Sequence, residues 1–198
     1  MRDLPQPVQL NAWTRALVAA MLEREQETGH HCRRTGAICD FIGRSCALDS
    51  GQRALLLAAA TLHDIGKIGI PDRILCKHAR FDAHDMAVMQ QHPVIGFRIL
   101  SGLDSDGAEE VAQAVLHHHE DFDGGGYPDG LAGEAIPLFA RIIALADSYD
   151  ALASARAYHA ALRHAEIMAV MHGRNCGRYD PYLFATFERQ MEHSEYRA

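Results

Sequence analysis

Two adjacent residues, His63 and Asp64, stand at the end of the most apolar stretch of the chain, "ALLLAAATLHDIG". Apolar residues lie on every side of that stretch, which predicts a buried helix and places both side chains in the interior. A histidine and a carboxylate left unpaired there would cost several kcal/mol, and a bound metal ion would supply the missing partners. Taken alone, the pair is explained better by a hydrogen-bonded core histidine.

Other nitrogen and oxygen ligands recur at helix ends and on apolar faces. Glu27 and His31 are four residues apart, so one helical face presents both if the helix continues through Gly29. His118 and His119 are adjacent and point about 100° apart on a helix, which lets them serve two different ions. Each candidate alone fits a structural role, but together they favour a multinuclear metal site. The eight candidates are Glu27, His31, His63, Asp64, His92, His118, His119 and Asp147.

The ligand types indicate the metal and its chemistry. Imidazoles mixed with carboxylates and without cysteine suit Fe, Mn or Zn with water in open positions. Two such ions bridged by one carboxylate are a common arrangement for phosphoester hydrolysis, since they bind phosphate oxygens and activate water at neutral pH. The ligand types therefore predict a site for two divalent ions, with Fe, Mn and Zn as the candidates.

A glycine-rich stretch, "HHHEDFDGGGYPDGLAGEAIP", contains the adjacent histidines and spans residues 117–137. Ordering so many glycines costs conformational entropy, and loops that carry such a cost commonly carry function. A purely structural role therefore explains this stretch poorly.

The elements expected to position these residues are helical almost throughout. Apolar positions such as Leu10, Trp13 and Leu17 recur at helical spacing, and no alternating strand pattern exceeds four residues. Residues 67–77 are interrupted by Gly and Pro, so we expect an irregular connection there, and Pro93 predicts a kink or a fresh start. The third helix is expected to stop at Gly66. The expected helices are about 8–29, 31–47, 54–66, 82–102, 107–120, 137–154, 159–172 and 180–192.

Length and composition indicate one all-α domain over residues 1–198, a bundle of about seven to eight helices with residues 1–7 as a tail. A net charge of −7 argues against a nucleic-acid polymer as partner. No apolar run reaches the length of a membrane span, and no signal peptide is evident. Cys32, Cys39 and Cys46 fall seven apart on one helical face, so we expect a core stripe in a reducing, cytoplasmic compartment.

Five segments resemble, in order, the motifs of HD-GYP domains, which are bacterial phosphodiesterases of the HD metal-dependent phosphohydrolase superfamily. The segments are "HDIGKIGIPDRIL", "HPVIGFRIL", "HHEDFDGGGYPDGLAGEAIPL", "ARIIALADSYDAL" and "RAYHAAL". The resemblance covers about residues 27–187, and the combination HHExxDGxGYP is specific, whereas a bare HD dipeptide is not. It implies an HD-domain helical bundle with a glycine-rich GYP loop. It also implies hydrolysis of cyclic di-GMP to linear pGpG and often onward to GMP.

The resemblance assigns a role to each candidate. All of the eight except Glu27 fall on metal-ligand positions, with Asp64 as the bridging carboxylate, and Glu27 matches the glutamate of members with three ions. His117 falls outside the motif and is expected to be a bystander. Lys67 would stabilise charge on the phosphate or assist the leaving oxygen, and Tyr127 would stack against or hydrogen-bond the dinucleotide.

Within the glycine-rich loop, Asp123–Gly126 is expected to act as a hinge that lets the backbone approach a dinucleotide. Tyr127 and Pro128 would then place an aromatic wall near the substrate. Glu120 is expected to orient a ligand histidine from behind.

The chain departs from the family pattern at several positions. Arg156 would clamp a phosphate, but His159 stands where the family has Arg or Lys, so a permanent charge is replaced by a mostly neutral ring. The usual KPG reads KHA at residues 77–79. His84 and Asp85 stand where a glutamate pair is common, and we interpret them as surface substitutions.

An active cyclic di-GMP phosphodiesterase is therefore the leading hypothesis. The alternative is a slow or inactive HD-GYP module that binds metal and cyclic dinucleotide and acts through protein partners, such as a diguanylate cyclase. A third hypothesis is hydrolysis of a mixed cyclic dinucleotide. A homodimer is compatible with each. Since the sequence contains no receiver or sensory segment, we expect either a stand-alone enzyme regulated by partners or a fragment of a longer protein.

Overall fold

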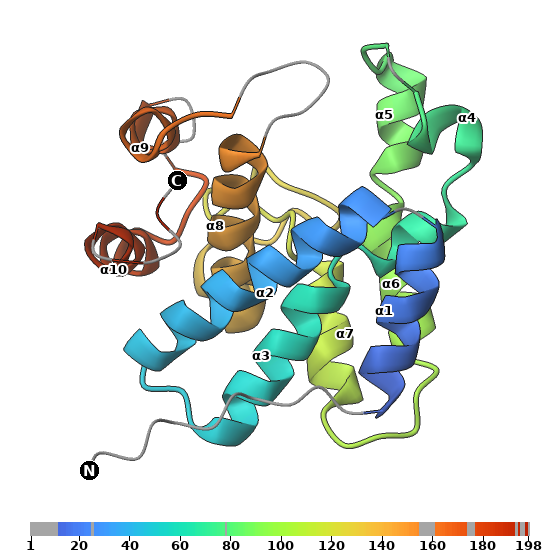
Figure 1. Cartoon of the computed structure of the whole chain (residues 1–198), viewed down its shortest axis with the longest axis horizontal. Helices are drawn as coiled ribbons and strands as arrows, with labels where there is room; N and C mark the ends of the chain where they lie inside the picture. Colours follow the sequence, from blue (N-terminus) through green and yellow to red (C-terminus); the bar gives the residue numbers. More distant parts are fainter. Residues whose placement is uncertain are drawn as a thin grey trace.

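The computed structural model describes residues 12–24, 26–77, 79–154, 161–173, 177–192, 194 and 197, and the side chains of residues 26–28 lie outside the described part. The described residues form ten α-helices and two 3₁₀-helices with no strand, which confirms the predicted all-α fold (Figure 1). Within these ranges, no helix combines the length and apolar character that crossing a bilayer requires. The helices are α1 (Ala12–Arg24), α2 (Gln26–Ser45), α3 (Ser50–Leu62), η1 (Ile65–Gly69), α4 (Asp72–Leu75), α5 (Ala83–Met89), α6 (His92–Leu100), α7 (Ala108–Leu116), η2 (Gly133–Ala135), α8 (Leu138–Ala153), α9 (His164–Gly173) and α10 (Pro181–Met191).

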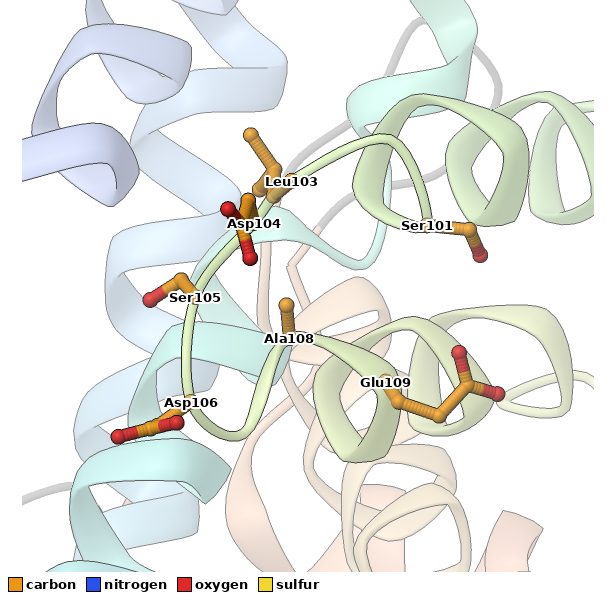
Figure 2. Close-up of a pocket in the computed structure, with 7 residues that line it drawn as sticks. All are labelled: Ser101, Leu103, Asp104, Ser105, Asp106, Ala108 and Glu109. Carbon is orange, nitrogen blue, oxygen red and sulfur yellow. The ribbon is translucent and has the colours of Figure 1, made fainter.

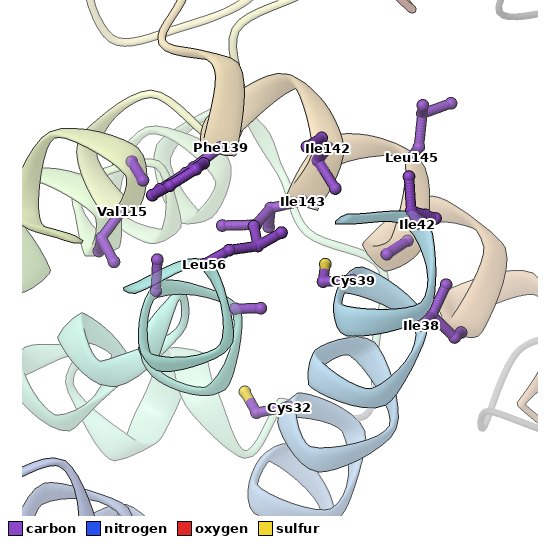
Figure 3. Close-up of a cluster of buried hydrophobic side chains, with 14 of the residues drawn as sticks. Cys32, Ile38, Cys39, Ile42, Leu56, Val115, Phe139, Ile142, Ile143 and Leu145 are labelled. Atoms are coloured by element: carbon purple, nitrogen blue, oxygen red, sulfur yellow. The ribbon is translucent and has the colours of Figure 1, made fainter. Parts of the chain in front are cut away.

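The apolar core lies between α2, α3, α7 and α8. Helix α2 packs against α3 and α8, and α3 packs against α7. Figure 3 shows side chains from all four helices meeting in one cluster, with Leu56 near its centre. Cys32 and Cys39 point into it and are fully buried, which confirms the core stripe at these positions. Cys46 lies just past the end of α2 and is only half-buried.

The boundary between the first two helices lies earlier than predicted. Helix α1 ends at Arg24 and α2 begins at Gln26, so α2 runs through Gly29. A Cβ at Gly29 would lie 2.1 Å from Leu22 Cδ2, so this glycine lets the two helices approach closely instead of ending a helix. Residues 27 and 31 consequently share one helix, as the pairing of Glu27 with His31 required.

The segment between α3 and α6 contains more helices than predicted, and the total exceeds the expected seven to eight. The stretch expected to be irregular contains η1 and α4, and the expected helix 82–102 is divided into α5 and α6. Pro93 lies in the first turn of α6, where its missing N–H has no helical partner to lose. Asp82 and Asp85 form a capping box that starts α5. Asp85 is therefore a buried structural residue that also accepts a hydrogen bond from Lys77, not a surface substitution.

Helix ends bring the histidines to one place. Helix α3 ends at Leu62 rather than at Gly66, with His63 as its C-cap residue. Gly66 lies in η1, where a Cβ would lie 1.9 Å from the His92 carbonyl oxygen, so glycine is needed for the close approach of η1 to α6. Helix α7 ends at Leu116, and the three adjacent histidines follow it.

Candidate functional site

Three histidines share one hydrogen-bond arrangement. In His63, His92 and His118, ring Nδ1 lies 2.7 to 2.8 Å from the main-chain carbonyl oxygen three residues earlier. A carbonyl oxygen only accepts, so Nδ1 carries a proton, and in the neutral ring Nε2 then keeps a free lone pair. All three residues are buried. The helix ends thus select the tautomer that a metal ligand requires.

The Nε2 atoms of His92 and His118 lie 3.4 Å apart. Because both carry lone pairs, they cannot hydrogen-bond to each other, and a cation between them would relieve their repulsion. His119 completes a trio whose ligand atoms all lie within 4.8 Å of one another. Burial lowers the pKa of His92 and of His118, and lowers that of His119 to about 3, so the trio is neutral at pH 7.

A second group of potential metal ligands consists of His31, His63 and Asp64. Within it, Asp64 also approaches the trio. Its Oδ1 lies 3.3 Å from His92 Nε2, and its Oδ2 lies 3.5 Å from His63 Nε2. Burial opposes the charged form of Asp64, but Lys67 and the nearby histidines hold its pKa well below the usual range. A charged carboxylate with one oxygen toward each group has the arrangement expected of a bridging metal ligand.

Lys67 contacts the same carboxylate from η1. Its Nζ donates to Asp64 Oδ2 at 2.7 Å. Burial lowers the pKa of Lys67, but the charge of Asp64 outweighs it and the pKa is raised. Lys67 is therefore a permanent ammonium beside the proposed metal ligands.

His31 lies between two carboxylates of α8. Its Nε2 is 2.9 Å from Asp147 Oδ1, and its Nδ1 is 2.6 Å from Asp150 Oδ2. Burial would lower the pKa of His31, but the hydrogen bonds to Asp147 and Asp150 raise it to about 9. Burial likewise opposes the charge on Asp147, yet His31 and His63 hold its pKa well below the usual range.

Asp150 and Arg34 are functional candidates that the sequence reasoning missed. Arg34 binds Asp150 with two hydrogen bonds, from Nε to Oδ1 at 2.7 Å and from a terminal nitrogen to Oδ2 at 2.9 Å. Asp150 therefore holds His31 while Arg34 holds Asp150. Their spacing in the sequence could have identified them. Asp150 lies three residues after Asp147, and Arg34 lies three residues after His31, so each pair shares a helical face.

A cavity of about 320 Å³ opens beside these groups. Tyr127 lies on its wall, with its ring centroid 4.9 Å from that of His119 and the planes tilted by 30°. Burial raises the pKa of the Tyr127 phenol well above its usual value, so it remains a neutral hydroxyl. The lining residues are His31, Asp64, Lys67, Leu75, Phe81, Met89, His92, His119, Tyr127, Asp147 and Ala151.

The glycine-rich loop is held by the residues that precede it. Glu120 accepts hydrogen bonds from the main-chain N–H groups of residues 129, 130 and 131 at 2.8 to 3.1 Å. It therefore orients the loop, whereas the sequence had led us to expect that it orients a ligand histidine. His117, the expected bystander, lies 3.0 Å from Asp129 through Nε2 and also holds the loop. A Cβ at Gly126 would lie 2.2 Å from Asp121 N, so this glycine lets the loop fold back on its own backbone.

The side chains of three predicted site residues, Arg156, His159 and Glu27, lie outside the described part of the chain. Arg156 and His159 lie outside the described residues, as does His78. Glu27 lies on α2, but its side chain is outside the described part. The other predicted site residues meet at one cavity or contact residues that line it.

A larger cavity of about 480 Å³ lies in the connection between α6 and α7 (Figure 2). Its polar lining comes from Asp104, Asp106, Glu109 and two serines, with no histidine and no basic side chain among the lining residues. It offers neither imidazole ligands nor a cation for a phosphate. The histidine-lined cavity is therefore the candidate site.

Comparison with known proteins places this site in a family. The family described as HD domain matches residues 16–183. The cyclic di-GMP phosphodiesterase response regulator RpfG of Xanthomonas campestris pv. campestris is 39% identical over 165 residues, which cover 83% of this chain and 44% of the regulator. The chain thus spans less than half the length of that relative.

Solved structures show the same fold. The structure of Bd1817, an HDG"Y"P protein from Bdellovibrio bacteriovorus, matches with a TM-score of 0.66 and 19% identity, over 90% of this chain and 57% of that one. A cyclic GMP-AMP specific phosphodiesterase of V. cholerae, V-cGAP3, matches with a TM-score of 0.57 and 28% identity, over 91% of this chain and 40% of that one. The family match and the shared helical fold show that the chain belongs to the HD domain family, as its HD-GYP motifs predicted.

Proposed function

We propose that the chain is a metal-dependent phosphodiesterase that hydrolyses cyclic di-GMP to linear pGpG and onward to GMP. The observation that carries the proposal is the position of Asp64, which directs one oxygen to each of two histidine groups while Lys67 donates to it. The Xanthomonas relative, which is named as a cyclic di-GMP phosphodiesterase, supports the choice of substrate.

The donor set fits divalent metal ions. Imidazole nitrogens, together with buried charged carboxylates and no thiolate, suit Fe or Mn, with Zn, Ni or Mg as alternatives. When bound, such ions supply positive charge to the phosphate and lower the pKa of an attacking water. We propose two ions, and a third where Glu27 also binds. The proposed ligands are Glu27, His31, His63, Asp64, His92, His118, His119 and Asp147.

The remaining residues of the cavity bind and orient the substrate. The Lys67 ammonium faces the space beside Asp64, where it would stabilise negative charge that develops on the phosphate. Tyr127 presents a neutral hydroxyl and a ring face to the dinucleotide. Arg156 and His159 stay proposed phosphate contacts on the strength of their sequence motif alone.

The test is turnover of cyclic di-GMP by protein loaded anaerobically with Fe or Mn, with the products followed by chromatography. We expect pGpG to form first and GMP later. His63→Ala combined with Asp64→Ala should remove both bound metal and turnover. Ligand binding without turnover under either metal would contradict the enzyme and support the binding module instead.

A mixed cyclic dinucleotide is the second candidate substrate, because the V. cholerae structure is that of a cyclic GMP-AMP specific phosphodiesterase. Running the same assay with 3′3′-cyclic GMP-AMP compares the two. We also propose a cytoplasmic location, which suits the free thiols of Cys32, Cys39, Cys46 and Cys76. A diguanylate cyclase partner and a homodimer stay predictions from the family resemblance.

A further inference from the structure

The candidate cavity has both charged and apolar lining residues. Asp64 and Lys67 line it together with the histidines, and Leu75, Phe81 and Met89, which we name the apolar side, come from the segment that contains α4 and α5. These three side chains are half-buried, and none of them belongs to the apolar core cluster or packs against it. Their apolar surface therefore faces the cavity rather than completing the core.

The apolar side comes from an arm formed by α4 and α5, which stands away from the rest of the bundle (Figure 1). Arg24 of α1 anchors the arm at its start, with a hydrogen bond to the Ile70 carbonyl at 3.0 Å and an ion pair with Asp72 at 2.6 Å. Lys77 and Asp85 close the turn between the two helices. The arm thus has a defined shape although it contributes little to the core.

Phe81 has a fixed place in this arm. It directly precedes Asp82, whose side chain accepts from the Asp85 main-chain N–H at 2.9 Å and so starts α5. The backbone direction at Phe81 is therefore set by the cap. Its ring is the only aromatic ring among the three side chains of the apolar side.

We propose that Leu75, Phe81 and Met89 form a wall that binds a nucleobase of the cyclic dinucleotide, with Phe81 as the stacking residue. This inference rests on the proposed function, because a phosphate beside Lys67 carries a ribose and a base toward the rest of the same cavity. A planar base gains from contact with an aromatic and two flexible apolar side chains. Stacking of a base on an aromatic ring is typically sequence-tolerant, since every base has a π face.

The chemistry of the wall also defines its specificity. The three side chains offer no amide or hydroxyl that could read the edge of a base. The wall therefore raises the affinity for guanine and adenine alike and leaves discrimination between them to other contacts. It determines dinucleotide affinity rather than the choice between cyclic di-GMP and 3′3′-cyclic GMP-AMP.

The experiment compares Phe81→Ala and Phe81→Trp with Met86→Ala as the matched control. Met86 is also an apolar residue of α5, but it is 46% exposed and does not line the cavity. Metal-loaded proteins are titrated with cyclic di-GMP and with 3′3′-cyclic GMP-AMP by calorimetry, and kcat and KM are measured for both. We expect Phe81→Ala to raise Kd and KM about 10-fold for both ligands while kcat and metal content change less than about twofold. Phe81→Trp and Met86→Ala should stay close to the wild type.

Three results would overturn the wall. An unchanged Kd in Phe81→Ala would show that Phe81 does not stack on a base. An equal loss of affinity in Met86→Ala would show that the effect is not specific to the wall. A loss of affinity for only one dinucleotide would show that the wall reads base edges. A wild-type protein that binds the dinucleotides but does not cleave them contradicts only the proposed phosphodiesterase activity. In that case the Kd values of the variants still test whether the wall binds a base. A wild-type protein that binds neither dinucleotide overturns the proposed function and the wall with it.

Discussion

His92 and His118 face each other through their Nε2 atoms at 3.4 Å, while the other nitrogen of each ring is hydrogen-bonded to a main-chain carbonyl. The two rings come from different helix ends, 26 residues apart in the chain. Because each ring carries its proton on Nδ1, the Nε2 lone pairs of the two rings face each other in a buried space. Such an arrangement is poor in hydrogen bonds and well suited to a cation.

Metal should therefore stabilise the protein, and His118→Ala should remove that effect. An ion at about 1,000 times its Kd adds about 4 kcal/mol, which raises Tm by roughly 8 to 16 °C in a chain of this size. Thermal unfolding with Mn and with chelator measures the difference between the two conditions. His172→Ala is the control, because His172 pairs with Glu188 on the surface. A rise in Tm that persists in His118→Ala would place the ions elsewhere.

Metal affinity should increase with pH because of His31. In the metal-free protein its pKa is raised to about 9, so below that pH an ion must displace a proton from Nε2. One such proton makes the apparent affinity rise about tenfold per pH unit up to that value. Titrations with Mn at pH 6, 7 and 8 measure the slope, and buffers of different ionisation enthalpy count the proton released.

The same group predicts the opposite trend for stability without metal. The pKa of His31 is higher in the folded chain, about 9, than its ordinary value of 6.5. Its contribution is therefore complete below pH 6.5 and is lost as pH rises through 9. Chelated wild-type protein should unfold at lower temperature at pH 9 than at pH 6.5. An equal drop in His31→Gln would assign the pH effect to another residue.

Asp150 and Arg34 should act through His31. Asp150→Asn removes the negative charge behind the imidazole, so we expect metal affinity to fall about 10- to 100-fold. Arg34→Ala should give a smaller loss, because the Asp150 carboxylate remains and loses only the two hydrogen bonds from Arg34. Arg44→Ala is the matched control, since Arg44 also pairs with an aspartate, Asp40, from α2. The readout is the Kd for Mn together with the pH slope, which a merely structural loss would leave unchanged.

Glu120 should stabilise the glycine-rich loop rather than the metal ions. Its carboxylate accepts three main-chain N–H groups, and Glu120→Gln removes the charge that strengthens those bonds. We expect a loss of about 1 to 3 kcal/mol in urea unfolding and faster proteolysis between residues 123 and 133. Glu110→Gln, on the exposed face of α7, should change neither quantity. Intact protease resistance in Glu120→Gln would show that other contacts hold the loop.

Gly66 should tolerate no side chain. A Cβ there would lie 1.9 Å from the His92 carbonyl oxygen, which is a backbone atom and cannot shift without moving His92. Gly66→Ala should cost about 3 kcal/mol or more and lower metal content together with stability. Gly173→Ala is the control, because among the described residues no atom outside its own helix turn and its chain neighbours lies within 4 Å of its Cβ position. Urea unfolding and elemental analysis of both variants provide the comparison.

The sequence predicted the helices well because their apolar periodicity is local information. It failed where tertiary contacts decide. Gly29 and Gly66 were interpreted as helix ends, yet each is a glycine because another segment lies against it, which no local pattern reveals. The resemblance to the family motifs identified the ligand positions. His31, His63 and His92 could therefore be named before the structure showed them close together.

The residues behind the ligands could not be predicted in the same way. Asp150 meets His31 across 119 residues of chain and Arg34 across 116, so their pairing depends on how α2 packs against α8. Glu120 was recognised as a supporting residue, but its partners are three main-chain N–H groups of a loop. The conformation of that loop cannot be predicted from its amino-acid composition. Asp85 looked like an exposed substitution because its cap and its lysine partner come from the fold of the arm.

The hydrogen bonds that fix the histidine tautomers have an electrostatic consequence. Their acceptors are carbonyls of Ala60, Met89 and Val115, each within the last turn of α3, α5 or α7. The last carbonyls of a helix have no partner within it and form the negative end of its dipole. Three such ends therefore point at one space, so the peptide backbone itself attracts cations there. The three histidines thus cap the carboxyl ends of α3, α5 and α7 through Nδ1, the ring nitrogen that does not face the proposed ions.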